Sequence, residues 1–341
     1  MGEAKSLIPS PWSAVSAPPF LPNAADPIHW ISKELKGRFG GRVRKASLDT
    51  GATCPNRDGT LGVGGCAFCD PGGSGPDDPI PGEGWAERLT RLARMALDRG
   101  EPGVIAYFQA YTATHGVAAE KLEAMLKTAF AVPGVAGLAL GTRPDCLPAE
   151  LLAVLERWAR ARPLWVELGM QSRHDATLRA MNRGHDHACT VAAAEALRAR
   201  SVPVVLHLIL GLPGEDTGAM HASIAEAARL NPWGVKLHPL HVLRGSALER
   251  PWRAGRLPLL SREAYAALAA DAIEALPPEV TIHRLTGERP GDLLLAPGWC
   301  TDKRATLGAI LKELAQRHGW QGRRPGFQRE TSTAAAASLP Q

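Results

Sequence analysis

Short apolar runs alternate with amphipathic stretches along most of this chain. The run Val204-Val-Leu-His-Leu-Ile-Leu210 is almost continuously apolar, which is typical of a strand buried on both faces. In residues 118–130 the apolar side chains of Leu122, Met125, Leu126 and Phe130 recur at the spacing of one helix face. Strands buried on both faces imply a parallel sheet covered by helices, so the pattern predicts an α/β protein.

The alternation predicts six β/α units, preceded by a helix at residues 28–39. The expected strands cover residues 42–49, 104–109, 135–141, 164–170, 203–210 and 234–242, and the expected helices cover 84–99, 118–130, 148–161, 189–200 and 216–230. Beyond residue 261 we expect another helix, a strand at 280–285 and a final helix at 306–317. The alternation fits an open doubly wound sheet and a barrel equally well.

Composition suggests one domain of barrel size with appendages. The chain has 341 residues, 45% of them apolar, and no composition shift divides its body. Residues 1–27 are rich in Pro, Ser and Ala, which predicts a flexible lead with no signal peptide. Residues 331–341, TSTAAAASLPQ, are expected to be a disordered tail. Between them we expect a barrel at 28–260 and a C-terminal extension at 261–330.

Positive charge gathers in two segments. The formal net charge is +5, and residues 33–45 carry six Lys or Arg against one Glu, while residues 299–330 carry seven against three acids. Such segments are either solvated faces or contacts for the phosphates of a nucleic acid or nucleotide. The longest apolar run, residues 202–213, is too short to span a bilayer, so no membrane partner and a cytoplasmic protein with reduced thiols are expected.

Three of the six cysteines lie within sixteen residues, spaced C-x11-C-x2-C, in a loop rich in Gly and Pro. A disulfide framework is disfavoured because the cysteines are sparse and three is an odd number. Zinc normally takes two close pairs of ligands, and only one pair, Cys66 and Cys69, is present. Three thiolates, with Cys54 as the first, suit a [4Fe–4S] cluster whose fourth iron stays open. Inert buried thiols are the third alternative.

The stretch RVRKASLDTGATCPNRDGTLGVGGCAFCD resembles the cluster loop of radical SAM enzymes, specifically the YhcC/YtqA-like bacterial family that carries CPNRDGT. The resemblance covers most of residues 29–317. It implies a partial (β/α)6 TIM-type barrel with a C-terminal α/β extension, a [4Fe–4S] cluster on Cys54, Cys66 and Cys69, and S-adenosyl-L-methionine as second cofactor. The first gap is longer than the commonest C-x3-C-x2-C spacing. Phe68 keeps the aromatic position before the last Cys, which in the superfamily sits near the adenine.

Polar side chains follow several expected strands, at the ends where chemistry gathers in α/β barrels. Gln109 and Tyr111 follow the second strand, Glu167 and Gln171 belong to the fourth, and His207 belongs to the fifth. Because a buried charge is costly unless paired, Glu167 either pairs with Arg143 or Lys236 or serves a site. His207 is either a core histidine or a member of the same site.

The resemblance adds a role for each of these residues. The segment Glu167-Leu-Gly-Met-Gln-Ser172 is similar to the fourth-strand segment whose acidic residue binds the ribose of S-adenosylmethionine, with Gln171 beside it. Many radical SAM enzymes have Gly-Gly-Glu after the second strand, and here Gln109 and Tyr111 would take over its contacts to the methionyl group. His207 precedes Gly211-Leu-Pro-Gly-Glu215, which resembles the fifth-strand loop of oxygen-independent coproporphyrinogen dehydrogenase and of the elongator catalytic subunit.

Two functional hypotheses follow. The first is a radical SAM enzyme that cleaves S-adenosylmethionine reductively and directs a 5′-deoxyadenosyl radical at an unidentified substrate. It implies a reducing partner such as flavodoxin or ferredoxin. We expect the two basic segments to converge on the barrel mouth, which favours tRNA or another phosphate-bearing substrate, with tRNA suggested by analogy with the elongator subunit. The second hypothesis is a zinc-stabilised nucleic-acid-binding module without catalysis.

Overall fold

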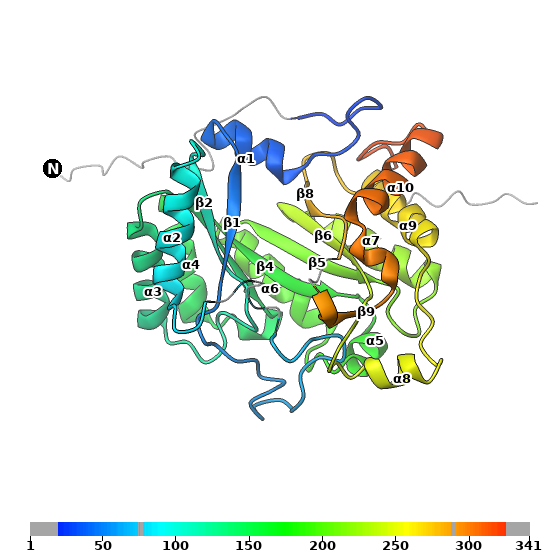
Figure 1. Cartoon of the computed structure of the whole chain (residues 1–341), viewed down its shortest axis with the longest axis horizontal. Helices are drawn as coiled ribbons and strands as arrows, with labels where there is room; N and C mark the ends of the chain where they lie inside the picture. The colour runs from blue at the N-terminus through cyan, green and yellow to red at the C-terminus, as the bar shows by residue number, and fades with distance from the viewer. Residues whose placement is uncertain (1–19, 74, 76–77, 79, 288–290, 325–341) are drawn as a thin grey trace, which may run out of the picture.

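The structure, a computed structural model, describes residues 20–73, 75, 78, 80–287 and 291–324 (Figure 1). The predicted tail at 331–341 and most of the predicted lead at 1–27 lie outside the described residues. The boundary between a barrel at 28–260 and an extension at 261–330 stays a prediction.

A curled sheet of seven parallel strands forms the centre of the molecule, in the order β1-β2-β3-β4-β5-β6-β8 (Figure 1). The strands are β1 (Val43–Leu48), β2 (Gly103–Phe108), β3 (Val135–Thr142), β4 (Leu164–Gln171), β5 (Val204–Leu210), β6 (Gly234–Pro239) and β8 (Thr281–Arg284). Its outer face is covered by α2 (Trp85–Leu97), α3 (Ala119–Ala131), α4 (Ala149–Ala161), α6 (His187–Ala199), α7 (Thr217–Leu230) and α9 (Arg262–Ala275). The partial (β/α)6 barrel with a C-terminal α/β extension is confirmed, and β8 of that extension continues the barrel sheet beside β6.

The elements that the pattern missed are short. They are the helices α5 (Asp175–Ala180) and α8 (Glu249–Arg253), three 3-10 turns, and a small antiparallel pair made of β7 (Val242–Leu243) and β9 (Leu294–Ala296). None is long enough to produce a periodic pattern of apolar residues, which is why the sequence does not reveal them.

Buried apolar side chains form three clusters in the part of the chain that the structure describes, and two of them lie on the two faces of the sheet. The larger one lies between the sheet and its covering helices and includes Leu140, Leu155 and Leu206, all fully buried. The smaller one lies inside the curl, where α1 (Ile31–Phe39) places Leu35 against Ile105 and Trp165. Helix α1 therefore covers the amino end of the barrel, which is the end where the strands begin.

The expectation that both basic segments converge on the barrel mouth is wrong. Because α1 comes before β1, it lies at the amino end of the strands, opposite the cysteine loop (Figure 1). The backbone N–H of Gln321 donates to the carbonyl of Pro27, so the C-terminal segment reaches the same amino end. Arg44 pairs there with Glu101, and Lys45 is the residue of the first segment that lines the interior.

In the part of the chain that the structure describes, no helix combines the length and apolarity that a bilayer crossing requires.

We predict that Leu206→Ala lowers the free energy of unfolding by about 2–5 kcal/mol, because it leaves a cavity between the sheet and its helices. Leu206 is fully buried, whereas Leu311 of α10 (Lys303–Gln316) is 38% exposed. The matched variant Leu311→Ala is therefore expected to stay within about 1 kcal/mol of the parent protein. Urea unfolding followed by circular dichroism measures both, and equal losses would contradict this assignment of the core.

Candidate active site

A cavity of about 420 Å³ lies inside the curl and extends to the carboxyl ends of the strands, where the cysteine loop crosses below them. It gathers all of the predicted site residues: its lining includes Cys54, Cys66, Phe68, Cys69, Gln109, Tyr111, Glu167, Gln171 and His207. The other three cysteines, Cys146, Cys189 and Cys300, are absent from that lining. The structure thus brings together residues that are up to about 150 positions apart in the sequence.

The cysteine loop is shaped by its own turns. The N–H of Arg57 donates to the carbonyl of Cys54 at 2.7 Å, and the N–H of Gly65 donates to the carbonyl of Asn56 at 2.8 Å. Gly65 has φ +81°, and a Cβ there would lie 2.8 Å from the Arg57 guanidinium, so only glycine fits. The Asn182 amide donates to the Gly65 carbonyl at 2.8 Å, which fastens the loop to the segment after α5.

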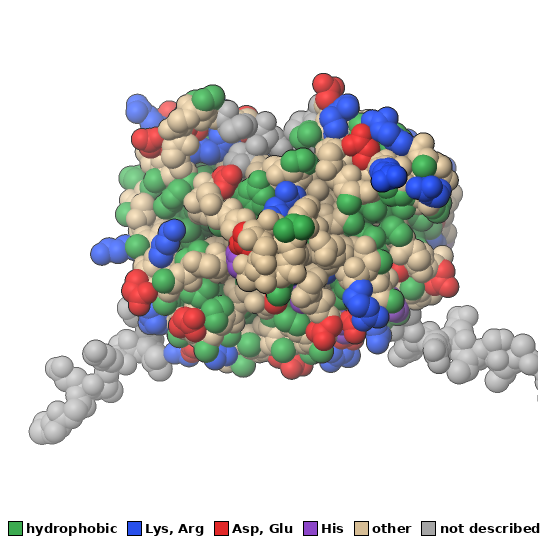
Figure 2. Space-filling model, turned by 90° about the horizontal axis from the view of Figure 1, so that it is seen from below, with side chains coloured by type: hydrophobic (Ala, Val, Ile, Leu, Met, Phe, Trp, Pro, Cys, Tyr) green, Lys and Arg blue, Asp and Glu red, His purple; other side chains and the backbone are tan. Residues whose placement is uncertain are grey.

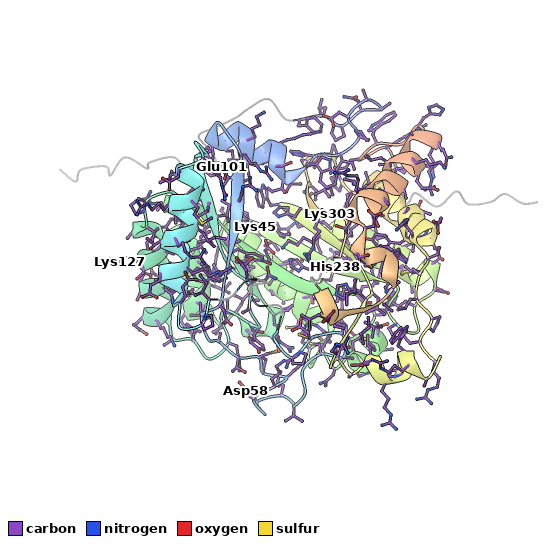
Figure 3. All side chains as sticks on the ribbon, viewed as in Figure 1. Lys45, Asp58, Glu101, Lys127, His238 and Lys303 are labelled. Atoms are coloured by element: carbon purple, nitrogen blue, oxygen red, sulfur yellow. The ribbon has the colours of Figure 1, made fainter. Side chains whose placement is uncertain are left out.

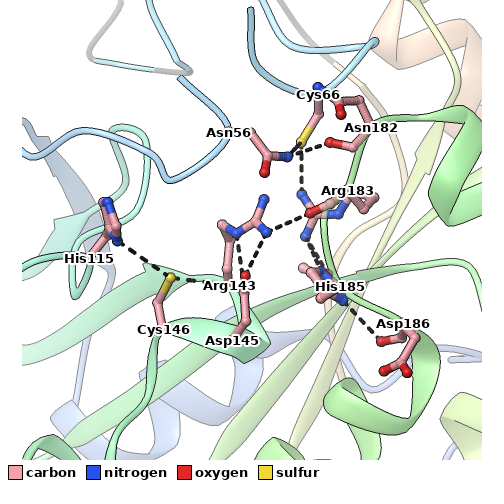
Figure 4. A network of polar contacts seen from close by, with 11 residues as sticks. Asn56, Cys66, His115, Arg143, Asp145, Cys146, Asn182, Arg183, His185 and Asp186 are labelled. Atoms are coloured by element: carbon pink, nitrogen blue, oxygen red, sulfur yellow. Dashed lines mark hydrogen bonds and ion pairs between the residues drawn. The ribbon is translucent and has the colours of Figure 1, made fainter. Parts of the chain in front are cut away.

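Nitrogen donors contact two of the three thiols, Cys66 and Cys69. Cys66 is 6% exposed, and it accepts hydrogen bonds from Arg183 at 3.2 Å and from Asn56 at 3.5 Å (Figure 4). Burial and the neighbouring Cys66 raise the pKa of Cys69 to about 11, although a hydrogen bond from Arg57 opposes that rise. A metal cation bound to these sulfurs would stabilise the negatively charged thiolate form, which burial otherwise disfavours.

This donor set fits an iron–sulfur cluster. Among the described residues no group of three or more His, Cys, Asp or Glu side chains is placed to hold a metal ion. A [4Fe–4S] cluster does not require its ligands to meet at one ion, because each thiolate binds a different iron. Hydrogen bonds to the sulfurs, here from Asn56, Arg57 and Arg183, are a recognised feature of protein-bound clusters.

Arg143 and Arg183 form a second layer behind the thiols. Arg143, 3% exposed, binds both oxygens of Asp145 at 2.9 and 2.7 Å and donates to the carbonyl of Arg183 at 2.5 Å (Figure 4). Burial opposes its charge, but Asp145 raises the pKa of Arg143 above its ordinary value. Sequence reasoning missed Arg183, because it lies in an irregular segment after α5 with no periodicity or motif around it.

Two predicted residues have strained backbones. Tyr111 has φ +51° and Gln171 has φ +64°, a region that side chains other than Gly rarely adopt and that is common at functional sites. The Tyr111 hydroxyl donates to the Pro71 carbonyl at 2.9 Å, and its N–H donates to the Gly73 carbonyl at 2.8 Å. Tyr111 therefore ties the end of β2 to the segment that follows Cys69.

A buried carboxylate joins the strands deeper in the curl. Glu167 is 1% exposed. Its oxygens accept hydrogen bonds from Lys45 at 2.7 Å, Tyr107 at 2.7 Å, Trp165 at 3.1 Å, His207 at 2.9 Å and also from Lys236. Burial opposes its charge, but Lys236 and Lys45 hold the pKa of Glu167 well below its usual range. Figure 3 shows Lys45 inside the curl of the sheet.

The geometry of Glu167 and His207 is compatible with a structural role in the interior and with a role in the site. The pairing of Glu167 with Lys236 is observed, whereas Arg143 pairs with Asp145 instead. Burial and Lys236 lower the pKa of His207 to about 4, so its imidazole is neutral at pH 7. Both residues also line the cavity, and their contacts to a cofactor stay predictions.

The matches to known proteins agree with this site. The model of the Radical SAM superfamily matches residues 52–226, and that of the Radical_SAM C-terminal domain matches residues 232–316. The uncharacterized protein YtqA of Bacillus subtilis is 39% identical over 308 residues, which cover 88% of this chain and 94% of that protein. A tRNA uridine(34) acetyltransferase of Dehalococcoides mccartyi is 33% identical over 191 residues, which cover 54% of this chain and 41% of that protein.

Solved structures support the fold. The archaeal Elp3 of Methanocaldococcus infernus, solved with an N-terminal deletion, aligns with a TM-score of 0.57 at 19% identity over 67% of this chain and 58% of that one. The superfamily model alone spans half of the chain, and the similarity to YtqA spans nearly all of that relative. The resemblance predicted from the cysteine loop is therefore confirmed, and the chain belongs to the radical SAM superfamily.

Proposed function

We propose that the protein is a radical SAM enzyme in which Cys54, Cys66 and Cys69 hold a [4Fe–4S] cluster and the cavity binds S-adenosylmethionine. The observation that carries the proposal is that these three thiols, together with the nitrogen donors to Cys66 and Cys69, line the same cavity as the polar strand-end residues. When bound, the cluster and S-adenosylmethionine supply a one-electron cleavage that yields a 5′-deoxyadenosyl radical, which takes a hydrogen atom from the substrate.

The protein's own residues bind and orient. The cysteine sulfurs accept hydrogen bonds from Arg57, Asn56 and Arg183. These donors would offset the negative charge of the sulfurs when the sulfurs bind iron. Phe68 is proposed to line the adenine. Gln109 and Tyr111 are proposed to accept from the methionyl ammonium, which a carboxamide or hydroxyl oxygen can do with less charge complementarity than a carboxylate.

Glu167 and Gln171 are the proposed ribose contacts, with His207 beside them. Gln171 ends β4 and has room to reach a ligand at the strand ends. Glu167 already accepts from five donors, and a carboxylate has about four lone-pair sites. A ribose contact from Glu167 therefore requires one of the present donors to give way.

The interior is closed at its amino end, which suits radical chemistry because it limits the access of water. Helix α1 covers the amino end, and apolar side chains such as Ile105 and Trp165 fill the curl beneath the polar network. Water then has access from the carboxyl end, where the cysteine loop and a bound cofactor lie across the opening. Excluding water in this way protects reactive intermediates.

The electron has to arrive from outside, from a reductant of the flavodoxin or ferredoxin class. The cysteine loop runs along the lower side of the molecule in Figure 1, and it carries Leu61 and Val63, which are 54% and 75% exposed. Seen from that side, Lys, Arg, Asp and Glu side chains are interspersed along the rim (Figure 2). An apolar tip beside the thiols is a suitable contact for a partner that must approach a cluster closely.

Superfamily membership supports the enzyme over the zinc-stabilised binding module. Colour distinguishes the two directly, because an iron–sulfur cluster absorbs visible light and zinc does not.

The tRNA proposal rests on the similarity to a tRNA uridine(34) acetyltransferase, which covers 54% of this chain. The basic segments at the amino end do not support it, because they lie away from the cavity mouth.

Replacing Cys54, Cys66 or Cys69 singly with Ala is expected to abolish cluster uptake and the formation of 5′-deoxyadenosine, because each thiolate holds a different iron. Iron and sulfide analysis after anaerobic reconstitution, with the visible spectrum, measures the first effect. Cys189→Ala is the matched control, since Cys189 lies in α6 outside the cavity. A full complement of iron in Cys54→Ala would contradict the ligand assignment.

Glu167→Gln is expected to keep the cluster but to weaken the binding of S-adenosylmethionine by about 1.5–3 kcal/mol, the worth of a hydrogen bond to a charged group. Calorimetry on the reconstituted protein gives that affinity. Glu226→Gln is the control, because Glu226 is also buried and paired, with Arg229, but lies in α7. An unchanged affinity together with a lower free energy of unfolding would leave Glu167 a purely structural role.

If tRNA is the substrate, its binding is expected to weaken steeply with salt, by about 0.7–0.9 in the log–log slope for each phosphate contact. Filter binding across a salt series measures the slope. Arg42→Glu and Arg323→Glu are expected to leave productive binding unchanged, because both residues belong to the amino-end segments. Absence of binding at low ionic strength would favour a small-molecule substrate.

A further inference from the structure

Many more cations than carboxylates line the cavity. Its charged lining residues are Lys45, Arg57, Arg143, Glu167, Arg183, Lys236 and Arg284. Arg57 and Arg183 hydrogen-bond to cysteine sulfurs, and Arg143 is paired with Asp145, so this outer group has its counter-charges. In the inner group, made of Lys45, Lys236 and Arg284, the two lysines share the single carboxylate of Glu167.

The inner cations face one another across the curl. In the sheet, Lys236 of β6 is paired with His207 of β5 on one side and with Arg284 of β8 on the other. Lys45 lies in the middle of β1, at the opposite edge of the sheet, yet its ammonium reaches Glu167. Figure 3 shows Lys45 and His238 inside the curl, away from Asp58 on the cysteine loop. The inner group is thus separate from the cluster-binding end.

Arg284 has no counter-charge among the described residues. Glu167 is occupied by Lys45 and Lys236, and no carboxylate that the structure describes lies within ion-pair distance of the Arg284 guanidinium. Its contact is with the ring of His238, a group that burial keeps uncharged at pH 7 by lowering its pKa. The Nε atom of Arg284 and the Nδ1 atom of His283 are buried without a hydrogen-bond partner.

The Arg284 side chain is half-buried and its Nε atom is fully buried, so the guanidinium is partly removed from water without an anion beside it, and an anionic ligand would offset that cost. We propose that the inner half of the cavity is a substrate site for an oxyanion, a carboxylate or phosphate group, held by Arg284 with Lys45 and Lys236. The guanidinium fork binds two oxygens of such a group at once, and the neighbouring ammonium groups add attraction. The inference builds on the proposed function, because it assigns the substrate class for the same cavity.

The proposed oxyanion site differs in position from the proposed cofactor site, and its depth excludes a nucleic-acid duplex. S-adenosylmethionine is proposed to lie at the strand ends, beside Gln109 and Gln171, whereas the inner cations lie deeper between the strands. Glu167, the proposed ribose contact, lies at the boundary between the two sites, because Lys45 and Lys236 both donate to it. The inner half is also covered at its far end by α1, so a single group on a substrate fits there and a duplex does not.

Calorimetric titration of the full-length, cluster-free protein with inorganic phosphate and, separately, with succinate tests the site at constant ionic strength in chloride. We expect at least one of the two anions to bind, and the preferred one identifies the phosphate or the carboxylate source. Arg284→Gln is expected to weaken that binding roughly 10- to 100-fold, as the loss of a charged donor does. Arg284→Lys keeps the charge and is expected to lose less, while Lys127→Met, at an exposed position of α3, loses nothing.

Two results would overturn the proposal. One is that neither anion binds, or that Arg284→Gln binds as the parent does while its circular dichroism shows a folded protein. The other is that Arg284→Gln weakens S-adenosylmethionine binding to the reconstituted protein as strongly as it weakens the anion, because the cations would then serve the cofactor's own carboxylate. Failure of cluster uptake, in contrast, contradicts only the proposed radical chemistry, since the titration needs no cluster.

Discussion

The free-energy cost of burying the Glu167 carboxylate determines which polar side chains lie around it in the interior of this protein. A lone carboxylate in that position would be unstable, and it persists because donors from five strands converge on it, with Lys45, Tyr107, Trp165, His207 and Lys236 as the contributing residues. The same contacts fix how the strands curl, since each donor has to reach one point from a different strand. Removing one partner leaves others uncompensated, so the network acts as a unit.

The cysteine loop depends on a different constraint, which is backbone conformation. Its glycines allow positive φ angles and a close approach to Arg57, and Tyr111 and Asn182 fasten it from two sides. Contacts within the protein thus define the shape of the loop and direct nitrogen donors at Cys66 and Cys69. A ligand loop held by such contacts has less conformational freedom to lose when it holds a cofactor.

The parts of the fold and of the site that could be predicted from the sequence are those that leave a local pattern in it. The strand at 204–210 and the helix at 118–130 follow from apolar periodicity, and the cysteine spacing with CPNRDGT indicates the family. The contact of Lys45 with Glu167 and the donor role of Arg183 depend on residues more than 100 positions apart in the sequence, which no local pattern encodes. The position of the basic segments was mispredicted because net charge says nothing about which end of a barrel a segment reaches.

Helix α1 has a kinetic consequence. Because it covers the amino end of the curl, the carboxyl end is the route by which molecules reach the interior. With a substrate group among the inner cations and a cofactor at the strand ends, as proposed, the substrate would have to enter before the cofactor and leave after it. A covered end of this kind would then impose a compulsory order of binding and release, in which the cofactor is the last to arrive and the first to go.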